Sequence, residues 1–211
     1  MATKYYAVRN GRSTGVFLTW AECQKQVTGF PGAVFKSFTT IEEAEAFVSE
    51  QTLRWQTKAE EEDRLLEIFE KEPDALVAYV DGSYNVDDGS FSYGMVLIHG
   101  GIEQSFCQRF EDEELATMRN VAGEIKGAEA AMRYAVAHGF SKLYIYHDYE
   151  GIARWCKGEW KANKDGTKAY KAYYDSICDI LQVMFVKVAA HTGDKYNEIA
   201  DKLAKQALGI S

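Results

Sequence analysis

Four acidic residues, far apart in the sequence, occupy positions that packing alone does not explain. Asp81 and Asp148 each end an apolar run that is typical of a buried strand, and ligand sites in α/β sheets collect at such strand ends. Glu124 lies four residues before Ala128, so its side chain points toward the apolar face of its predicted helix. Asp201 occupies a similar position on the last predicted helix. The four acids are therefore candidates for one shared site.

Several carboxylates can share a buried site only if something offsets their mutual repulsion and their loss of water. Without such compensation their pKa values rise and some of them become protonated. A divalent cation removes this conflict, and oxygen ligands without His or Cys suit Mg²⁺ or Mn²⁺. Two such ions support phosphoryl chemistry. The pattern alone still leaves a structural role open for each acid, because a strand-end aspartate often caps a turn and a helix glutamate can border the core.

The elements that must position these acids follow Pro73. Alternating apolar patterns, hairpin glycines at 100–101 and helix signals predict strands and helices over most of residues 75–211. In chain order we expect strands over 75–80, 91–99 and 102–110, a long helix over 115–138, a strand over 142–147, helices over 149–157 and 167–181, a strand over 183–189 and a helix over 196–208.

The first fifty residues predict a small separate module. Strands are expected over 5–8, 15–18 and 33–38. Thr19 with Glu22, and Thr40 with Glu43, have the spacing of capping boxes before helices over 23–27 and 44–48. The result is a compact β-β-α-β-α domain over residues 1–50. The polar, acidic stretch over 51–74 is interpreted as a partly helical linker, which leaves 75–211 as the second domain.

Composition limits the classes to which the protein can belong. With 46% hydrophobic residues and only 2 prolines, the sequence predicts a globular protein. The start lacks a secretory signal and no run is long enough to span a membrane, so we expect a cytoplasmic protein without a membrane partner. The four scattered cysteines are expected to be reduced. No obligate protein partner is evident, and we expect a monomer.

Net charge is −8, which argues against a nucleic-acid partner until its distribution is considered. Residues 1–40 carry five Lys/Arg side chains against the single acid Glu22. The first module is therefore basic within an acidic protein, which favours binding of nucleic acid there.

The segments around the four acids together resemble the ribonuclease H catalytic domain over residues 75–211. The shared motifs are YVDGSY at 79–84, GE at 123–124, YHD at 146–148, HTG at 191–193 and NEIADKLA at 197–204. The acids follow one another in the family's order, and the last motif is the most specific.

This resemblance implies a five-stranded mixed sheet flanked by helices, with Asp81, Glu124, Asp148 and Asp201 as ligands of two Mg²⁺ ions, for which Mn²⁺ could substitute. It also implies hydrolysis of the RNA strand of an RNA/DNA hybrid by a two-metal mechanism that leaves 5′-phosphate and 3′-hydroxyl ends. His191, in the loop before the last helix, would assist proton transfer or release of the product phosphate.

Nucleic-acid contacts of the catalytic domain are also implied. Asn120 matches a family position near the scissile site, and Arg119 is a candidate for a phosphate contact. Residues 154–171 carry six Lys/Arg side chains, but the segment is too short for the basic handle found in certain ribonucleases H. We expect Trp160 and Lys161 to contact the DNA strand there, and the first module to replace the handle.

Residues 1–50 resemble the hybrid-binding domain, similar to caulimovirus viroplasmin, that precedes many such ribonucleases. The likeness implies that Tyr6, Trp20 and Phe35 form an aromatic face against the sugars of the DNA strand, that Lys36 meets a phosphate, and that backbone groups read the RNA 2′-hydroxyls. Ser37 stands where the family often has a second lysine, which predicts a reduced affinity.

Two other classes of protein remain as alternatives. A resolvase, transposase or integrase core would use clustered acids on a similar sheet, but the first module and the closing motif disfavour it. A non-catalytic hybrid-binding or viral inclusion-type protein would keep the first module only, and the four intact acids argue against it.

Overall fold

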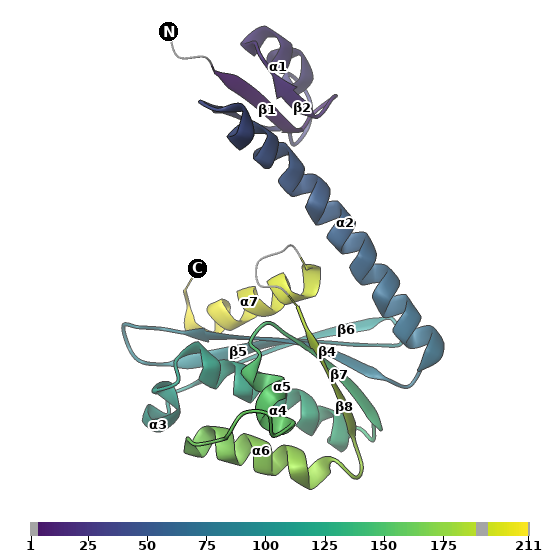
Figure 1. The fold of residues 1–211 in the computed structure, drawn as a ribbon, viewed down its shortest axis with the longest axis vertical. Coiled ribbons are helices and arrows are strands. Elements are labelled where there is room, and N and C mark those ends of the chain that lie inside the picture. Colours follow the sequence, from purple (N-terminus) through teal and green to yellow (C-terminus); the bar gives the residue numbers. More distant parts are fainter. Residues whose placement is uncertain (1–3, 189–193, 211) are drawn as a thin grey trace. The chain divides into compact units, whose positions relative to one another are not determined.

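The computed structural model describes residues 4–188 and 194–210, with the helical backbone alone for residues 49–61. The chain divides into two compact units, residues 1–60 and 61–211, which are described separately (Figure 1). No helix in the described part of the chain is long and apolar enough to cross a membrane.

The first unit is a three-stranded antiparallel sheet with strand order β2-β1-β3. Its elements are β1 (Tyr5–Asn10), β2 (Gly15–Phe17), α1 (Trp20–Val27), β3 (Val34–Phe38) and the beginning of α2 (Ile41–Lys71). The predicted capping box is present, because the Thr19 side chain accepts from the Glu22 backbone and the Glu22 carboxylate accepts from the Thr19 backbone. Val8, Cys23 and Val27 form the small core between the sheet and α1.

Helix α2 differs from the expected short helix and linker. It continues from Ile41 to Lys71, through the acidic stretch that was interpreted as a partly helical linker. The physical reason lies in the composition, because no Gly or Pro interrupts these residues and Glu, Ala, Leu and Lys favour the helix. The first residue that cannot continue a helix is Pro73.

The second unit contains a five-stranded mixed sheet with strand order β6-β5-β4-β7-β8. Strands β4, β5 and β6 form an antiparallel meander, while β7 is parallel to β4 and β8 is parallel to β7. The strands are β4 (Leu76–Tyr84), β5 (Phe91–His99), β6 (Ile102–Phe110), β7 (Lys142–His147) and β8 (Gln182–Lys187). The expected mixed sheet is confirmed.

Helices cover both faces of this sheet. Figure 1 shows α7 on one face and α4, α5 and α6 on the other. The larger core lies under α4, where Ile125, Ala128 and Met132 pack against the strands, and a second core lies on the opposite face. The helices of this unit after α2 are α3 (Glu113–Ala116), α4 (Asn120–Ala137), α5 (Gly151–Cys156), α6 (Asp165–Ile177) and α7 (Lys195–Leu208).

Two of the expected elements are corrected by the structure. The single helix expected over 115–138 is wrong, because α3 ends at Ala116 and α4 begins at Asn120 after Arg119, whose φ of 53° cannot continue a helix. Strand β4 continues past Asp81 to Tyr84, because its antiparallel pairing with β5 extends that far. Its parallel pairing with β7 stops at Tyr79, so Asp81 lies just beyond the last parallel pair.

Candidate active site

The start of α4 lies unusually close to the sheet, because the contact is made between glycines. A Cβ on Gly82 would come within 2.3 Å of the Asn120 carbonyl oxygen, and a Cβ on Gly123 within 2.0 Å of the Ser92 carbonyl oxygen. Backbone therefore packs directly on backbone at this point. The consequence is that the next residue, Glu124, enters the space above β4 and is only 2% exposed.

Three of the predicted acids converge at this point. Asp81, Glu124 and Asp148 each offer a carboxylate oxygen, and these oxygens all lie within 4.8 Å of one another. The three residues come from β4, from α4 and from the turn after β7. That turn is fixed by a 2.9 Å contact between Nδ1 of His147 and the backbone oxygen of Tyr149, which we assign as a hydrogen bond donated by the imidazole.

Burial makes these carboxyl groups hard to ionise. Desolvation, followed by the nearby charge of Asp148, raises the pKa of Asp81 from 3.8 to about 7. Burial, followed by the charges of Asp81 and Asp148, raises the pKa of Glu124 well above its usual value. Without a cation, protons must therefore stay in the cluster near neutral pH.

The cluster fits a hard divalent metal ion. Its ligand atoms are all carboxylate oxygens, the donor type that Mg²⁺ and Mn²⁺ prefer. Oε2 of Glu124 is buried and has no hydrogen-bond partner among the described residues. A buried oxygen without a partner is costly, and coordination to a cation would satisfy it while removing the repulsion within the cluster.

Asp201 lies beside this cluster but outside the group of three. It is on α7, where its Oδ2 accepts a 2.9 Å hydrogen bond from Lys205 Nζ, and its charge also raises the pKa of Asp81. Helix α7 is fixed on the sheet by a 2.6 Å hydrogen bond that Ser92 Oγ donates to the Ala204 carbonyl. A Cβ on Gly94 would lie 1.9 Å from the backbone oxygen of the residue before Asp201, so this contact also needs a glycine.

The other residues that the sequence predicted for the catalytic site and its nucleic-acid contacts lie as follows. His191 lies outside the described residues. Arg119 and Asn120 are exposed at the beginning of α4, one turn before Glu124. Trp160 is 38% exposed and packs edge-on against Trp155 and Tyr149, while Lys161 is exposed.

A groove of about 420 Å³ includes Tyr149, the residue after Asp148, in its lining, and the sequence had pointed to only one of the other polar residues that line it. Lys161 was predicted to contact nucleic acid, but Thr117, Asn163 and Lys164 line the groove as well. Tyr149 connects the groove with the acids. Burial raises the pKa of its phenol, and the nearby charge of Glu124 raises it further. The available signal was the run of polar and basic residues after Trp160.

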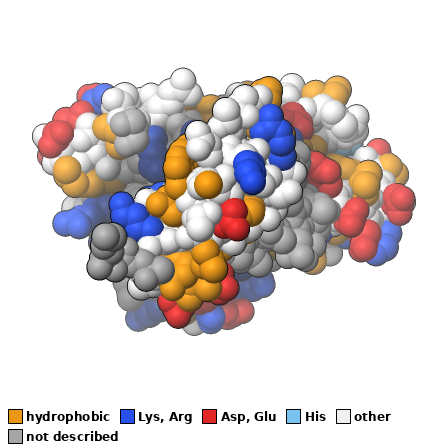
Figure 2. All heavy atoms as spheres, turned by 90° about the horizontal axis from the view of Figure 1, so that it is seen from above, with side chains coloured by type: hydrophobic (Ala, Val, Ile, Leu, Met, Phe, Trp, Pro, Cys, Tyr) orange, Lys and Arg blue, Asp and Glu red, His pale blue; other side chains and the backbone are white. Residues whose placement is uncertain are grey.

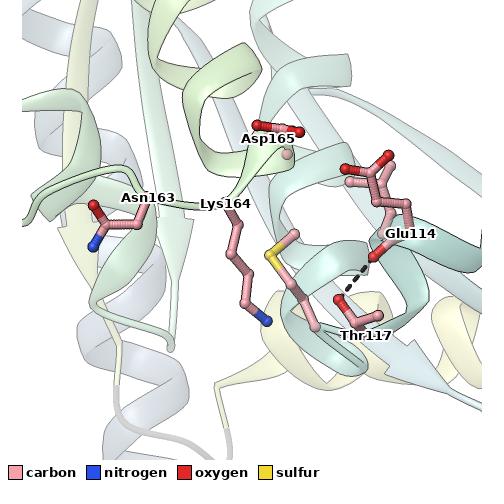
Figure 3. A pocket seen from close by; sticks show the side chains of 8 residues that line it. Glu114, Thr117, Asn163, Lys164 and Asp165 are labelled. Carbon is pink, nitrogen blue, oxygen red and sulfur yellow. Dashed lines mark hydrogen bonds between the residues drawn. The ribbon is translucent and has the colours of Figure 1, made fainter.

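One end of this groove is shown in Figure 3, in the smaller cavity that shares Thr117, Asn163 and Lys164 with it. The Lys164 side chain extends into the space between Asn163 and Thr117. The Thr117 hydroxyl donates a 2.8 Å hydrogen bond to the Glu114 carbonyl, which fixes the turn between α3 and α4. This end of the groove therefore carries the Lys164 cation and neutral hydrogen-bonding groups, together with the carboxylates of Glu114 and Asp165.

The first unit brings its predicted aromatic residues together in a row. The rings of Tyr6 and Trp20, and those of Trp20 and Phe35, each have centroids 5.7 Å apart. Trp20 is 42% and Phe35 is 44% exposed. Lys36 is the neighbour of Phe35 on β3 and projects from the other face, where its Nζ lies 5.3 Å from the centre of the Phe38 ring.

Exposed apolar groups on this unit are not limited to the row. Figure 2 shows hydrophobic side chains at the surface beside Lys and Arg side chains. Leu18 and Val34 are also exposed large hydrophobics in this unit. An apolar surface with neighbouring cations suits a ligand that has both stacking or sugar faces and phosphates.

Comparisons with known proteins agree with this arrangement. Residues 4–48 match the family model described as the ribonuclease H1 N-terminal domain, and residues 73–209 match the RNase H model. Human ribonuclease H1 is 30% identical over 96% of this chain and 88% of its own length, and the rat protein of that name is 28% identical over the same shares.

The solved structures show the same fold for the second unit. The RNase H1 of the archaeon Halobacterium salinarum aligns with a TM-score of 0.54 and 23% identity, covering 64% of this chain and 98% of that one. The N-terminal RNase H domain of a Mycobacterium tuberculosis protein aligns with the same TM-score and 19% identity, covering 64% of this chain and 94% of that one. Because the RNase H model covers more than half of the chain and the human relative is 30% identical over most of it, the chain belongs to the ribonuclease H family, in the form that carries the ribonuclease H1 N-terminal domain.

Proposed function

We propose that this ribonuclease H cuts the RNA strand of RNA/DNA hybrids endonucleolytically, by a two-metal mechanism that leaves 5′-phosphate and 3′-hydroxyl ends. The observation that carries the proposal is the convergence of Asp81, Glu124 and Asp148, with mutual oxygen distances within 4.8 Å and one buried Glu124 oxygen without a partner among the described residues. Such a site is costly for a protein that does not bind a cation.

The four acids Asp81, Glu124, Asp148 and Asp201 would hold the metal, for which Mg²⁺ is the natural choice and Mn²⁺ a substitute. When bound, divalent ions supply positive charge that stabilises the negative charge developing on the phosphate. Asp81 and Glu124 give up their protons when the site is loaded. The backbone contacts at Gly82 and Gly123 hold these two carboxylates in place, so the site does not have to reorganise.

His191 is proposed to move a proton during hydrolysis or to help the product phosphate leave. Support comes from its position in the chain, three residues before Asp194, the N-cap of α7, and ten before Asp201. An imidazole is suited to this role because its usual pKa lies near neutral pH.

The groove beside the acids is proposed to hold the nucleic-acid backbone. Lys161 and Lys164 would meet phosphates, and Asn163 and Thr117 would donate hydrogen bonds. Trp160 offers an exposed ring at the same segment, and Arg119 and Asn120 lie at the exposed start of α4. Residues 157–164, all of which the structure describes, form no helix between α5 and α6, so this short basic segment would act without a protruding handle.

Hybrid binding is assigned to residues 1–50, catalysis to residues 75–211, and a connecting role to residues 51–74. The row of Tyr6, Trp20 and Phe35 would pack on sugars of the DNA strand, because exposed neighbouring rings offer a flat apolar surface. Lys36 is proposed to reach a phosphate at the edge of β3, which would require its side chain to leave the Phe38 ring.

The decisive experiment is cleavage of a uniform RNA/DNA hybrid labelled on the RNA strand, with DNA duplex, RNA duplex and branched DNA run beside it. We expect cutting of the hybrid alone, dependent on Mg²⁺, with 5′-phosphate product ends. Asp81→Asn should abolish cutting and leave hybrid binding unchanged. Asp87→Asn, which changes an exposed acid in the loop after β4, is the matched control and should cut normally. Cutting of branched DNA instead, or full activity of Asp81→Asn, would refute the proposal.

A further inference from the structure

The last turns of α2 are built into the core of the second unit. Leu65 is 7% exposed and belongs to the same buried cluster as Tyr79, Tyr146 and Tyr196, and Ile68 and Phe69 pack against that cluster. These helix residues precede the segment 73–209 that matches the RNase H model. The catalytic unit therefore has a structural element that its family model does not include.

Arg64, on the same helix segment, reaches two elements of the catalytic unit. Its guanidinium carbon lies 5.4 Å from the centre of the Tyr146 ring, at the end of β7. Its Nη2 lies 3.8 Å from Oδ2 of Asp194. The Nε of Arg64 is buried and has no hydrogen-bond partner among the described residues, while the side chain as a whole is 40% exposed.

Asp194 has two distinct tasks at the beginning of α7. Its Oδ1 accepts a 3.0 Å hydrogen bond from the backbone N–H of Asn197 and so caps the helix, while Oδ2 faces Arg64. The residue is only 4% exposed. A carboxylate this deeply buried needs more than one backbone hydrogen bond to offset its loss of water, and the Arg64 guanidinium is the cation that lies beside it.

Helix α7 connects Asp194 with the active site. It carries Asp201 about two turns after Asp194. A shift of the start of α7 would therefore move the carboxylate that lies beside Asp81, whose pKa it already affects. A misplacement of about 1 Å, even from a change far from the reacting atoms, is sufficient to reduce turnover.

We propose that Arg64 is a positioning residue for catalysis: from the linker helix it pairs with Asp194 and sets the position of α7, and with it Asp201. This inference rests on the proposed role of Asp201 in the active site. The linker helix is accordingly part of the catalytic apparatus as well as a connection between two modules.

The test uses full-length variants assayed on the hybrid well below their unfolding temperatures. Arg64→Met removes the charge and retains much of the apolar stem, and we expect kcat to fall by about fivefold or more with KM within about twofold of the wild-type value. Arg64→Lys should restore most of the loss, and adding Asp194→Asn to Arg64→Met should do the same, because Asn keeps the cap oxygen without a buried charge. Lys71→Met is the matched control, since Lys71 forms an exposed ion pair with Glu67 on the same helix.

Hydrogen exchange of the backbone amides at 196–198 gives a readout that does not depend on cutting. Faster exchange in Arg64→Met, but not in Lys71→Met, supports the inference. An unchanged kcat in the folded Arg64→Met protein, or a loss that neither Arg64→Lys nor the double variant restores, would overturn it. If the wild-type chain cut no hybrid, the proposed function would fail, whereas unchanged exchange at 196–198 would reject the positioning role alone.

Discussion

At the scale of single residues, the acids of the candidate site suit the binding of a metal ion and lower the stability of the metal-free protein near neutral pH. Asp81 is 8% and Glu124 is 2% exposed, and burial followed by the charge of Asp148 raises the pKa of Asp81, while burial followed by the charges of Asp81 and Asp148 raises that of Glu124. A carboxyl group whose pKa is higher in the folded than in the unfolded chain binds its proton more tightly when folded. Its contribution to stability is therefore largest at low pH and is lost as pH rises toward the folded-state pKa.

This sign gives a prediction for the metal-free protein. The pKa of Asp81 is 3.8 in the unfolded reference and about 7 in the folded protein. With the metal removed by a chelator, the unfolding temperature should therefore be higher at pH 5 than at pH 8. Asp81→Asn removes this penalty and should stabilise the metal-free protein at pH 8 by about 1–3 kcal/mol. The measurement is thermal unfolding with EDTA at both pH values.

A second measurement separates this effect from a general change in stability. Adding Mg²⁺ at pH 8 should raise the unfolding temperature of the wild-type protein, and that of Asp81→Asn by much less. Equal metal-dependent shifts in the two proteins would mean that Asp81 is not a ligand.

A residue-scale prediction also applies to the aromatic row of the first unit. Trp20 contacts both Tyr6 and Phe35 and is 42% exposed, so Trp20→Ala should weaken hybrid binding by about fivefold to a hundredfold while kcat at saturating hybrid stays unchanged. Ile41→Ala, which truncates another exposed hydrophobic residue of the same unit, is the control. Binding curves by fluorescence anisotropy would test this, and equal affinities for the two variants would exclude the row as a binding surface.

At the scale of elements, the position of α4 depends on a contact between glycines. Gly123 lies against the backbone of β5, and an added Cβ would come within 2.0 Å of the Ser92 carbonyl oxygen. The Ser92 backbone is held by its pairing with the neighbouring strands, so the helix would have to move away instead. The helix therefore approaches as closely as it does only because both this position and Gly82 lack a side chain.

Substitution at this contact should change stability and activity together. Gly123→Ala is expected to destabilise the protein by about 1–3 kcal/mol despite the better helix propensity of alanine, and to reduce cleavage because Glu124 moves with the helix. Gly127→Ala is the matched control on α4, since its Cβ would meet its nearest neighbours at 3.1 and 3.3 Å. Chemical denaturation and hybrid cleavage of both variants are the measurements, and a fully active, stable Gly123→Ala would contradict the close approach.

At the scale of the whole molecule, charge is distributed unevenly along the chain. The protein has a net charge of −8, yet its first forty residues carry five basic side chains against one acid. Binding of a polyanion is therefore expected to depend on local basic surfaces and to weaken with added salt.

Two truncations should distinguish binding from the integrity of the catalytic unit. A chain beginning at residue 61 keeps Arg64 and Leu65 and should cut hybrid with a raised KM, because it lacks only the first unit. A chain beginning at residue 75 also loses the buried Leu65, and its free energy of unfolding should be lower by about 2–3 kcal/mol. Thermal unfolding and cleavage of the two would test this, and equal stability would show that the end of α2 does not belong to the catalytic unit.

Local patterns were sufficient where neighbouring residues decide the structure. The hairpin around Gly100 and Gly101, the capping box of Thr19 and Glu22, and the strand before Asp148 could all be predicted, because their signals lie within a few residues. The inward orientation of Glu124 followed from helical periodicity.

The sequence by itself determined which acids could act together, since their types and the order of their motifs can be recognised without coordinates. Tertiary structure alone decided how close they come, where β4 ends relative to Asp81, that α3 and α4 are separate, and that the end of α2 joins the core. The reason is that strand pairing, backbone contacts between glycines and helix packing bring together residues distant in the chain, and no local pattern specifies those distances.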